Sequence, residues 1–333
     1  MSAITQFGNR LYTGETSVNF IGRKWLWYAA STVAILLAVG ATVLRGGFSF
    51  GIEFRGGSEF QILGATEVTT SIAVETVTAE IGADAQVRST IVGGSTIRVQ
   101  TDQLTTEETD ALRAQLADAY SVDLNSVTSS FIGASWGSDI TGQALRALAI
   151  FVVLVSIVMA LYFRTWKMSV AAIVAMIHDL VITAAVYGAF GLEVTPAAII
   201  GLLTILGYSL YDTVVVFDKI RENTSISYDV SKRTFADSVN LAVNQTLVRS
   251  INTSVVAVLP VGSILFIGSF LLGAGTLRDI SLSLFIGIVA GAYSTMFIAA
   301  PLYAQLREGE AEESKQGRLI EEKIVRNDSG AVR

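Results

Sequence analysis

Long runs of apolar residues are the feature that most constrains how this chain can fold. They recur at Ile150–Phe163, Val170–Phe190, Pro196–Phe217, Val255–Leu272 and Ile280–Leu302. A helix that crosses a bilayer needs about 20 mostly apolar residues, and a soluble protein of 333 residues does not need several such runs. A further stretch, Trp25–Leu44, follows Arg23 and Lys24 and is too long for a cleavable signal peptide. The sequence therefore predicts about six transmembrane helices.

The composition agrees with this prediction and narrows the class of function. Hydrophobic residues make up 51% of the chain and charged residues only 16%, against roughly 25% in a typical soluble domain. The net charge of −6 gives no support to nucleic-acid binding, which requires a basic patch. No cysteine and only one histidine are present, which excludes disulfides and thiolate or histidine-rich metal sites. We expect no metal, no cofactor and no nucleic-acid partner.

Basic residues predict the orientation of the spans in the membrane. We place the spans near 25–45, 141–163, 169–190, 196–218, 246–272 and 276–303. The basic residues that fall on one side are Arg10, Arg23, Lys24, Arg164, Lys167, Lys219, Arg221, Lys232, Arg233, Arg307, Lys315, Arg318, Lys323 and Arg326. Lys and Arg favour cytoplasmic segments. We therefore expect a cytoplasmic N-terminus (1–24), a cytoplasmic tail (304–333), spans two to six within 141–303, and an extracytoplasmic segment (46–140).

Residues 46–140 have the pattern of a small folded domain. Alternating and helical periods succeed one another at Glu59–Leu63, Glu67–Ile81, Ala85–Val92, Thr96–Thr101, Thr105–Tyr120 and Leu124–Ile132. Gly93-Gly94 indicates a hairpin turn between the second and third strands. The order β-α-β-β-α-β is typical of the ferredoxin-like fold. The predicted fold class is therefore a membrane α-helical bundle with a small α+β ferredoxin-like extracytoplasmic domain between spans one and two.

Asp212 is the most informative polar residue in the predicted spans. A charge at bilayer depth costs about 2.5–3.5 kcal/mol on insertion scales and suggests a functional site. At helical spacing Asp212 shares a face of the fourth span with Thr204, Tyr208 and Tyr211. Such a stripe suits a helix that faces a partner or a wet cavity. We predict a carboxylate that binds a proton; the alternative is a structural carboxylate held by hydrogen bonds.

Other polar residues in the spans are weaker candidates for the same proton relay. Arg249 could alternately pair with Asp212 and release it, or extend its side chain to the membrane surface. His178 and Asp179, in the middle of span three, are either a relay beside Asp212 or a pair that ties helices together. Asp279 lies near the outer end of span six, where an interfacial position is the simpler interpretation.

Two glycine patterns are informative, one just after the first span and one within span six. Glu53, Arg55, Gly56 and Gly57 lie where the first span meets the outer domain. We interpret them as a coupling motif, although two glycines suit any tight bend at the start of a strand. The pattern G-x-x-x-G at Gly287–Gly291 in span six predicts close helix packing.

Four stretches of sequence resemble one known family. They are Phe50–Ser58, His178–Thr183, Ile205–Asn223 and Asn244–Pro260. Of these, Ile-Leu-Gly-Tyr-Ser-Leu-Tyr-Asp-Thr-Val-Val-Val-Phe-Asp-Lys-Ile-Arg-Glu-Asn is the most specific. Through these motifs, and over nearly the whole chain after residue 17, the sequence resembles the SecF family. That family is the smaller half of the SecD–SecF complex, within the resistance-nodulation-division superfamily of transporters.

The resemblance implies a function and a set of partners. It implies six spans with an external domain in the bacterial inner membrane. It implies use of the proton motive force to complete export of unfolded preproteins after the SecYEG translocon, with SecD and membrane lipid as further partners. The acid and the base that the family ties to proton passage correspond to Asp212 and Arg249. Glu53 departs from the aspartate that is more usual in the family, which leaves the geometry of that turn open.

Three other functions compete with this interpretation. A small-molecule exporter of the same superfamily would use the same carboxylate chemistry, but it usually has a larger external domain and both halves in one chain. An enzyme is disfavoured because Tyr211-Asp212 lacks the Gly-x-Gly-Asp element of intramembrane aspartyl proteases, and because His178 has no nucleophile in a recognisable motif. A purely structural stabiliser of the translocon would tolerate apolar residues at Asp212 and Arg249.

Overall fold

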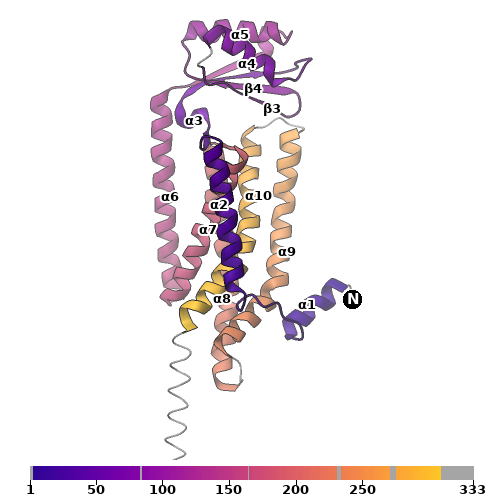
Figure 1. Cartoon of the computed structure of the whole chain (residues 1–333), viewed down its shortest axis with the longest axis vertical. Helices are drawn as coiled ribbons and strands as arrows, with labels where there is room; N and C mark the ends of the chain where they lie inside the picture. Colours follow the sequence, from indigo (N-terminus) through magenta and orange to yellow (C-terminus); the bar gives the residue numbers. More distant parts are fainter. Residues whose placement is uncertain (1–2, 83–84, 164, 231–233, 271–274, 309–333) are drawn as a thin grey trace, which may run out of the picture.

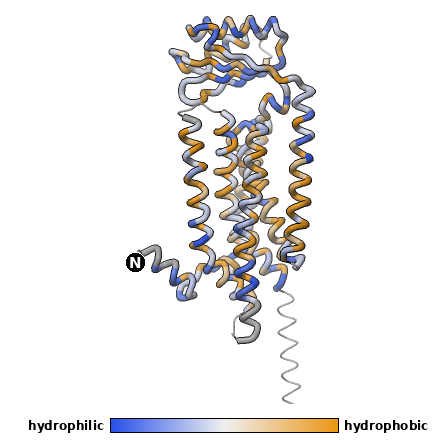
Figure 2. The backbone as a smooth tube through the Cα atoms, turned by 180° about the vertical axis from the view of Figure 1, so that it is seen from behind, coloured by the Kyte–Doolittle hydropathy of each residue, from blue (hydrophilic) through white to orange (hydrophobic). Residues whose placement is uncertain are grey.

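Six long apolar helices dominate the structure. The structure is a computed structural model, and it describes residues 3–82, 85–163, 165–230, 234–270 and 275–308. Among these residues, six helices are long and apolar enough to cross a membrane. They form a bundle that is hydrophobic along its middle, with more hydrophilic segments at both ends (Figure 2). The predicted number of spans is confirmed, and the chain is a multi-pass membrane protein.

The helices of the bundle follow the apolar runs of the sequence. They are α2 (Lys24–Leu44), α6 (Ala134–Phe163), α7 (Trp166–Phe190), α8 (Pro196–Val230), α9 (Phe235–Phe270) and α10 (Gly275–Ser294). The last helix continues through a π-helical segment, η2 (Thr295–Ala299), as far as residue 308. A separate helix, α1 (Ala3–Thr13), precedes the bundle. Arg164, Lys232, Arg233, the end of the predicted fifth span at residues 271–272 and the tail 309–333 lie outside the described residues.

Helices α8 and α9 are longer than the spans predicted for them. The segment between residues 218 and 246, predicted as a polar connection, is helical on both sides of residues 231–233. Ile220, Val239 and Val243 are fully buried there, in the same apolar cluster as Tyr303. These apolar contacts stabilise both α8 and α9 as helices beyond the predicted ends of the spans. The two helices therefore reach past the rest of the bundle (Figure 1).

Small residues set the centre of the bundle. Among the six, helices α7, α8 and α10 have the largest share of buried residues in their apolar stretch (44%, 44% and 56%), whereas α2, α6 and α9 have few (11%, 6% and 11%). Ala171, Ala172 and Ala175 of α7 are almost completely buried. Small side chains let helix backbones approach closely, which is a main source of stability between helices in lipid.

A compact α+β unit stands on one end of the bundle (Figure 1). Its elements are β2 (Gly57–Ile62), α4 (Thr70–Ile81), β3 (Arg88–Val92), β4 (Thr96–Thr101), α5 (Thr106–Ala119), a 3-10 turn η1 (Leu124–Ser126) and β5 (Val127–Ile132). The strands form one antiparallel sheet in the order β3-β4-β2-β5. The order of elements along the chain is β-α-β-β-α-β, as predicted. We call residues 57–132 the α+β unit.

Local sequence signals explain how the α+β unit folds. Gly93 and Gly94 both have positive φ, 64° and 74°, as a tight hairpin turn between β3 and β4 requires. Thr105 and Glu108 form a capping box at the start of α5. One face of the sheet packs with α4 and α5 around apolar residues, including Phe60 and Leu112, which are fully buried. The other face is polar and lies toward the bundle.

Three short elements between the unit and the bundle were not predicted. β1 (Ser49–Phe50) pairs in parallel with β6 (Glu193–Val194), which lies between α7 and α8. A helical turn, α3 (Ile52–Arg55), then leads into β2. Elements of two and four residues are too short to produce a periodic signal in a sequence.

Candidate functional site

Asp212 occupies a buried position on α8, directed at α9. Its side chain accepts a hydrogen bond at Oδ1 from the Ser250 hydroxyl of α9, over 2.9 Å. Its other oxygen, Oδ2, is buried and has no hydrogen-bond partner among the described residues. The residue as a whole is 8% exposed. Of the residues predicted to share its face, Tyr211 and Thr204 are exposed, so Asp212 lies at the buried edge of that stripe.

His178 and Asp179 belong to a line of polar side chains that crosses three helices. Nε2 of His178 lies 2.6 Å from the Ser31 hydroxyl of α2. Nδ1 of His178 lies 3.5 Å from Oδ1 of Asp179, and Oδ2 of Asp179 accepts a hydrogen bond of 2.5 Å from Ser209 of α8. Ser209 is one turn before Asp212 on the same helix. The structure thus brings both predicted aspartates to neighbouring turns of α8.

Arg249 does not pair with Asp212 in this structure. No ion pair within 4.0 Å joins the two residues, both of which belong to the described part of the chain. The Arg249 side chain is exposed on α9, directly before the buried Ser250 that donates to Asp212. The predicted base therefore stands next to the residue that contacts the acid, without contacting the acid itself.

Helix α10 packs against α8 at the two predicted glycines. A Cβ atom on Gly287 would come within 2.5 Å of Ile205, and one on Gly291 within 2.9 Å of Ser209. Farther along, the Thr213 hydroxyl of α8 is 3.0 Å from the hydroxyl of Thr295, the first residue of the π-helical segment. Single π-helical turns occur often at functional sites. The glycines hold α10 against the turns of α8 that carry Ser209 and Asp212.

The predicted coupling motif lies at the junction of the bundle and the α+β unit. Oε2 of Glu53 is buried and has no hydrogen-bond partner among the described residues. Arg55 donates from Nη1 to Gln86 of the unit, over 3.2 Å. Gly56 and Gly57 have φ values of 79° and 143°, a region that favours glycine. The motif therefore makes the sharp bend between α3 and β2.

Burial is the largest influence on Glu53, and it raises the pKa of that carboxyl above its usual value. The hydrogen bond of its own backbone and the charge of Arg98 lower the pKa, whereas the negative charges of Glu193 and Glu59 raise it further. The net shift is upward because a carboxylate loses more hydration on burial than these partners restore.

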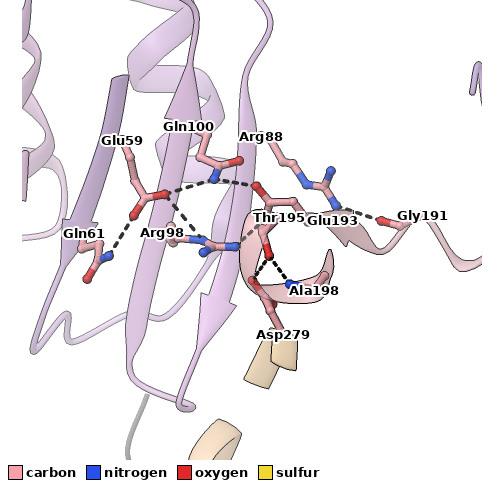
Figure 3. Close-up of polar contacts among 10 residues, drawn as sticks. All are labelled: Glu59, Gln61, Arg88, Arg98, Gln100, Gly191, Glu193, Thr195, Ala198 and Asp279. Carbon is pink, nitrogen blue, oxygen red and sulfur yellow. Dashed lines mark hydrogen bonds and ion pairs between the residues drawn. The ribbon is translucent and has the colours of Figure 1, made fainter. Parts of the chain in front are cut away.

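Sequence reasoning missed a polar network below the sheet, which Figure 3 shows. Arg98 and Gln100 of β4 reach Glu193 of β6, and Thr195 reaches Asp279 of α10. On β4 these polar residues alternate with buried apolar ones, a pattern that normally indicates a face open to water. Nothing in the sequence distinguishes a strand face that meets solvent from one that meets another polar surface.

The geometry offers proton-binding and hydrogen-bonding groups. Among the described ranges, no group of three or more His, Cys, Asp or Glu side chains is placed to hold a metal ion. The buried acids at Asp179 and Asp212 sit among hydroxyl groups, which can both donate and accept hydrogen bonds. What the arrangement can do chemically is bind and release a proton at a carboxylate.

Several known proteins of similar sequence belong to one family. The family of protein export membrane proteins SecD/SecF, in its C-terminal part, matches residues 112–309, more than half of the chain. The protein translocase subunit SecF of Streptomyces coelicolor is 44% identical over 93% of this chain and 82% of its own length. The protein translocase subunit SecF of Mycobacterium tuberculosis is 42% identical over 91% of this chain and 70% of its own length.

A solved structure has a similar fold. The crystal structure of SecDF, a translocon-associated membrane protein from Thermus thermophilus, matches 88% of this chain with a TM-score of 0.75 and 30% identity. The match covers 39% of that longer protein. Sequence motifs, fold and relatives agree, and the chain therefore belongs to the SecF branch of the SecD/SecF family of protein export membrane proteins.

Proposed function

We propose that the chain is an accessory subunit of the Sec protein translocase that couples proton flow through its helices to a late stage of preprotein export. Its partners in this proposal are SecD, the SecYEG translocon and unfolded preproteins, with lipid around the bundle. Support comes from the named relatives, which are translocase subunits. It also comes from the fused SecDF protein, of whose length this chain matches 39%.

The proposal places the chain in the bacterial inner membrane with both termini in the cytoplasm. The α+β unit is then an extracytoplasmic domain, and its strand order supports a ferredoxin-like fold. Lys24 and Glu308 form an ion pair of 2.7 Å at the end of the bundle remote from that unit. Lys167, which donates to the carbonyl of Leu306, lies at the same end. These lysines support a cytoplasmic position for that end, because Lys and Arg favour the cytoplasmic side.

The observation that carries the proposal is the half-satisfied carboxylate of Asp212. An ionised carboxylate deep in an apolar helix is costly unless several donors surround it. Here one hydroxyl reaches Oδ1 and none reaches Oδ2 among the described residues. A carboxylate locked for structural purposes would have both oxygens bonded. A proton that arrives on Oδ2 meets no existing hydrogen bond that must first break.

Protonation of Asp212 supplies a switch between α8 and α9. Ionised Asp212 attracts Arg249, which stands one residue from Ser250 on α9. Protonated Asp212 has no such attraction, so uptake of a proton would release Arg249. Each charge that crosses the membrane potential contributes about 2.3 kcal/mol per 100 mV. A difference of a few kcal/mol is enough to move a two-state element.

The line from Ser31 through His178 and Asp179 to Ser209 is the proposed approach to this switch. Hydroxyl, imidazole and carboxyl groups can each accept and pass on a proton. The line ends one turn of α8 from Asp212. His178 and Asp179 therefore act as relay groups in the proposal, and no residue is assigned a catalytic role.

The test replaces Asp212 by Asn, which keeps the shape of the side chain and removes its charge. In cells that carry Asp212→Asn with the partner subunit, export of a secreted reporter should lose its dependence on the proton motive force. The rate with and without a protonophore should become equal at the low, uncoupled value. Asp218→Asn is the matched control, because Asp218 lies farther along the same helix and is exposed. If export in Asp212→Asn cells kept its full dependence on the proton motive force, the proposal would be wrong.

A further inference from the structure

Arg98 ties the α+β unit to the connection between α7 and α8 (Figure 3). Its Nη2 donates to Oε2 of Glu193 over 2.5 Å, and its Nε lies 4.0 Å from Oε2 of Glu59. The three side chains are 12%, 7% and 11% exposed in that order. A guanidinium remains charged at any physiological pH. The contact is therefore a buried, charged link between two parts of the molecule that are far apart in sequence.

Glu193 and its neighbours are held by several elements of the bundle. Backbone pairing joins Glu193 to Ser49 of β1, which follows α2. The Thr195 hydroxyl donates to Oδ2 of Asp279 in α10 over 2.9 Å and accepts from the first turn of α8. Helix α8 begins at the next residue and is continuous as far as Asp212 and beyond. A displacement of α8 along or about its axis must therefore move Glu193.

The surface between the sheet and this connection is polar on both sides. Gln100 is 2% exposed and donates to Oε1 of Glu193 over 2.7 Å and to Glu59 over 3.0 Å. Arg88 donates from Nη2 to the carbonyl of Gly191 over 2.9 Å. The apolar core of the α+β unit lies on the opposite face of the sheet. If the unit lifts away from the bundle, the groups uncovered here are ones that water can hydrate.

We propose that Arg98 and Glu193 form a releasable latch that holds the α+β unit down on the connection between α7 and α8, so that movement of α8 is passed to the unit. Arg98 is a positioning residue in this scheme. The idea that α8 drives the latch rests on the proposed function; the existence of the latch does not.

Physical chemistry favours a contact that opens without unfolding. Contacts between domains of one chain resemble transient protein interfaces and are more polar than permanent ones. Buried ion pairs gain little net stability, because the cost of removing two charges from water nearly cancels their attraction. Release returns that hydration to Arg98 and Glu193. A small bias from the membrane helices is then sufficient to open the latch.

The absence of cysteine from the sequence allows a direct test by thiol labelling. Gln100→Cys places one thiol in the closed contact, and the chain in lipid nanodiscs is treated with a bulky fluorescent maleimide. The labelling rate reports how often the sheet separates from the connection between α7 and α8 and exposes the thiol. Adding Arg98→Gln should raise the rate roughly tenfold, the effect of losing a hydrogen bond to a charged group. Adding Arg98→Lys should restore most of the slow rate.

Leu112→Cys is the matched control, because Leu112 is fully buried in the apolar core between the sheet and α5. Its thiol should remain unlabelled in every background, since a latch opens without exposing that core. Equal labelling of Gln100→Cys with and without Arg98→Gln would show that no latch exists. Parallel labelling of Leu112→Cys would show that the unit unfolds rather than undocks, which also overturns the proposal.

Asp212→Asn separates this proposal from the function on which part of it rests. If α8 drives the latch, Asp212→Asn should change the labelling rate of Gln100→Cys severalfold, and Arg98→Gln should abolish that difference. An effect of Arg98→Gln without any effect of Asp212→Asn leaves the latch standing and overturns its link to Asp212. If Asp212→Asn loses proton-coupled export while Gln100→Cys is labelled at its usual rate, the contact between Arg98 and Glu193 and its release still stand.

Discussion

Buried carboxylates with an unpaired oxygen occur at three positions in the part of the chain that the structure describes. Oδ1 of Asp179, Oδ2 of Asp212 and Oε2 of Glu53 are each buried without a hydrogen-bond partner in the described part of the chain. Buried polar atoms are almost always bonded, so each exception needs a reason. Under the proposed function, Asp179 and Asp212 take up and release protons, which requires an oxygen that no donor occupies permanently. The three acids lie in α7, in α8 and at the junction with the α+β unit.

Glu53 gives a prediction about pH and stability. Its pKa is raised in the folded protein, chiefly by burial. The stability associated with Glu53 is therefore complete below the ordinary pKa of glutamate, about 4.3, and is lost as the pH rises through the higher folded value. Glu53→Gln does not carry this loss. The variant should melt at a higher temperature than the parent at neutral pH, and the difference should vanish near pH 4.

Glu108 provides a control of opposite sign for that experiment. Hydrogen bonds from Thr105 lower its pKa at the start of α5. Its contribution is present above the ordinary pKa of glutamate and is lost as the pH falls. Glu108→Gln should therefore melt below the parent at neutral pH, with a gap that narrows in acid. A Glu53→Gln variant that follows the trend of Glu108→Gln would contradict the assignment of Glu53 as a buried, poorly solvated acid.

At the scale of elements, the contact between α8 and α10 decides where the acids lie. Ser209 and Asp212 are on adjacent turns of α8, and Gly287 and Gly291 of α10 leave room for that part of the helix. Any side chain at the glycine positions would push the two helices apart. The line of polar groups from α7 would then lose its contact with Ser209.

Gly287→Ala tests this packing. The new Cβ would meet Ile205 at 2.5 Å, so one of the helices must shift. Overpacking of this kind costs about 1–3 kcal/mol, and thermal melting in detergent should show a clear decrease. Gly40→Ala is the control, because Gly40 lies within α2 with nothing inside 4 Å of the new atom. Alanine there should be neutral or slightly stabilising, since it favours a helix more than glycine does.

Sequence predicts an element well where its apolar pattern extends over many residues. It predicts poorly where the position of a residue depends on a polar contact with another part of the fold. The apolar runs identified every span, and Asp179 and Asp212 stood out because a charge in such a run is rare. The helical extensions of α8 and α9 were missed, because their apolar stripe is visible only once Tyr303 is placed beside Ile220 and Val243. Glu193 and Arg98 were missed because each looks like an ordinary surface charge until the sheet meets the bundle.

At the scale of the whole molecule, the α+β unit and the bundle have separate apolar cores. The core of the unit consists only of residues from within it and its connections. A fragment of residues 57–132 should therefore fold alone and unfold cooperatively on heating, as followed by circular dichroism. Leu112→Ala should lower its stability by about 2–5 kcal/mol, because Leu112 is fully buried. Ser129→Ala, on an exposed side chain, should have little effect.

The way the unit is joined to the bundle determines how it can move. The chain enters it at β2 and leaves it at β5, which are neighbouring strands of the sheet. Both covalent links to the bundle therefore lie at one side of the sheet, and β3 forms the opposite edge, which has no covalent link to the bundle. A domain that rotates about one attached side moves farthest at the opposite edge. Small rotations near α3 and α6 would thus produce the largest displacement at β3.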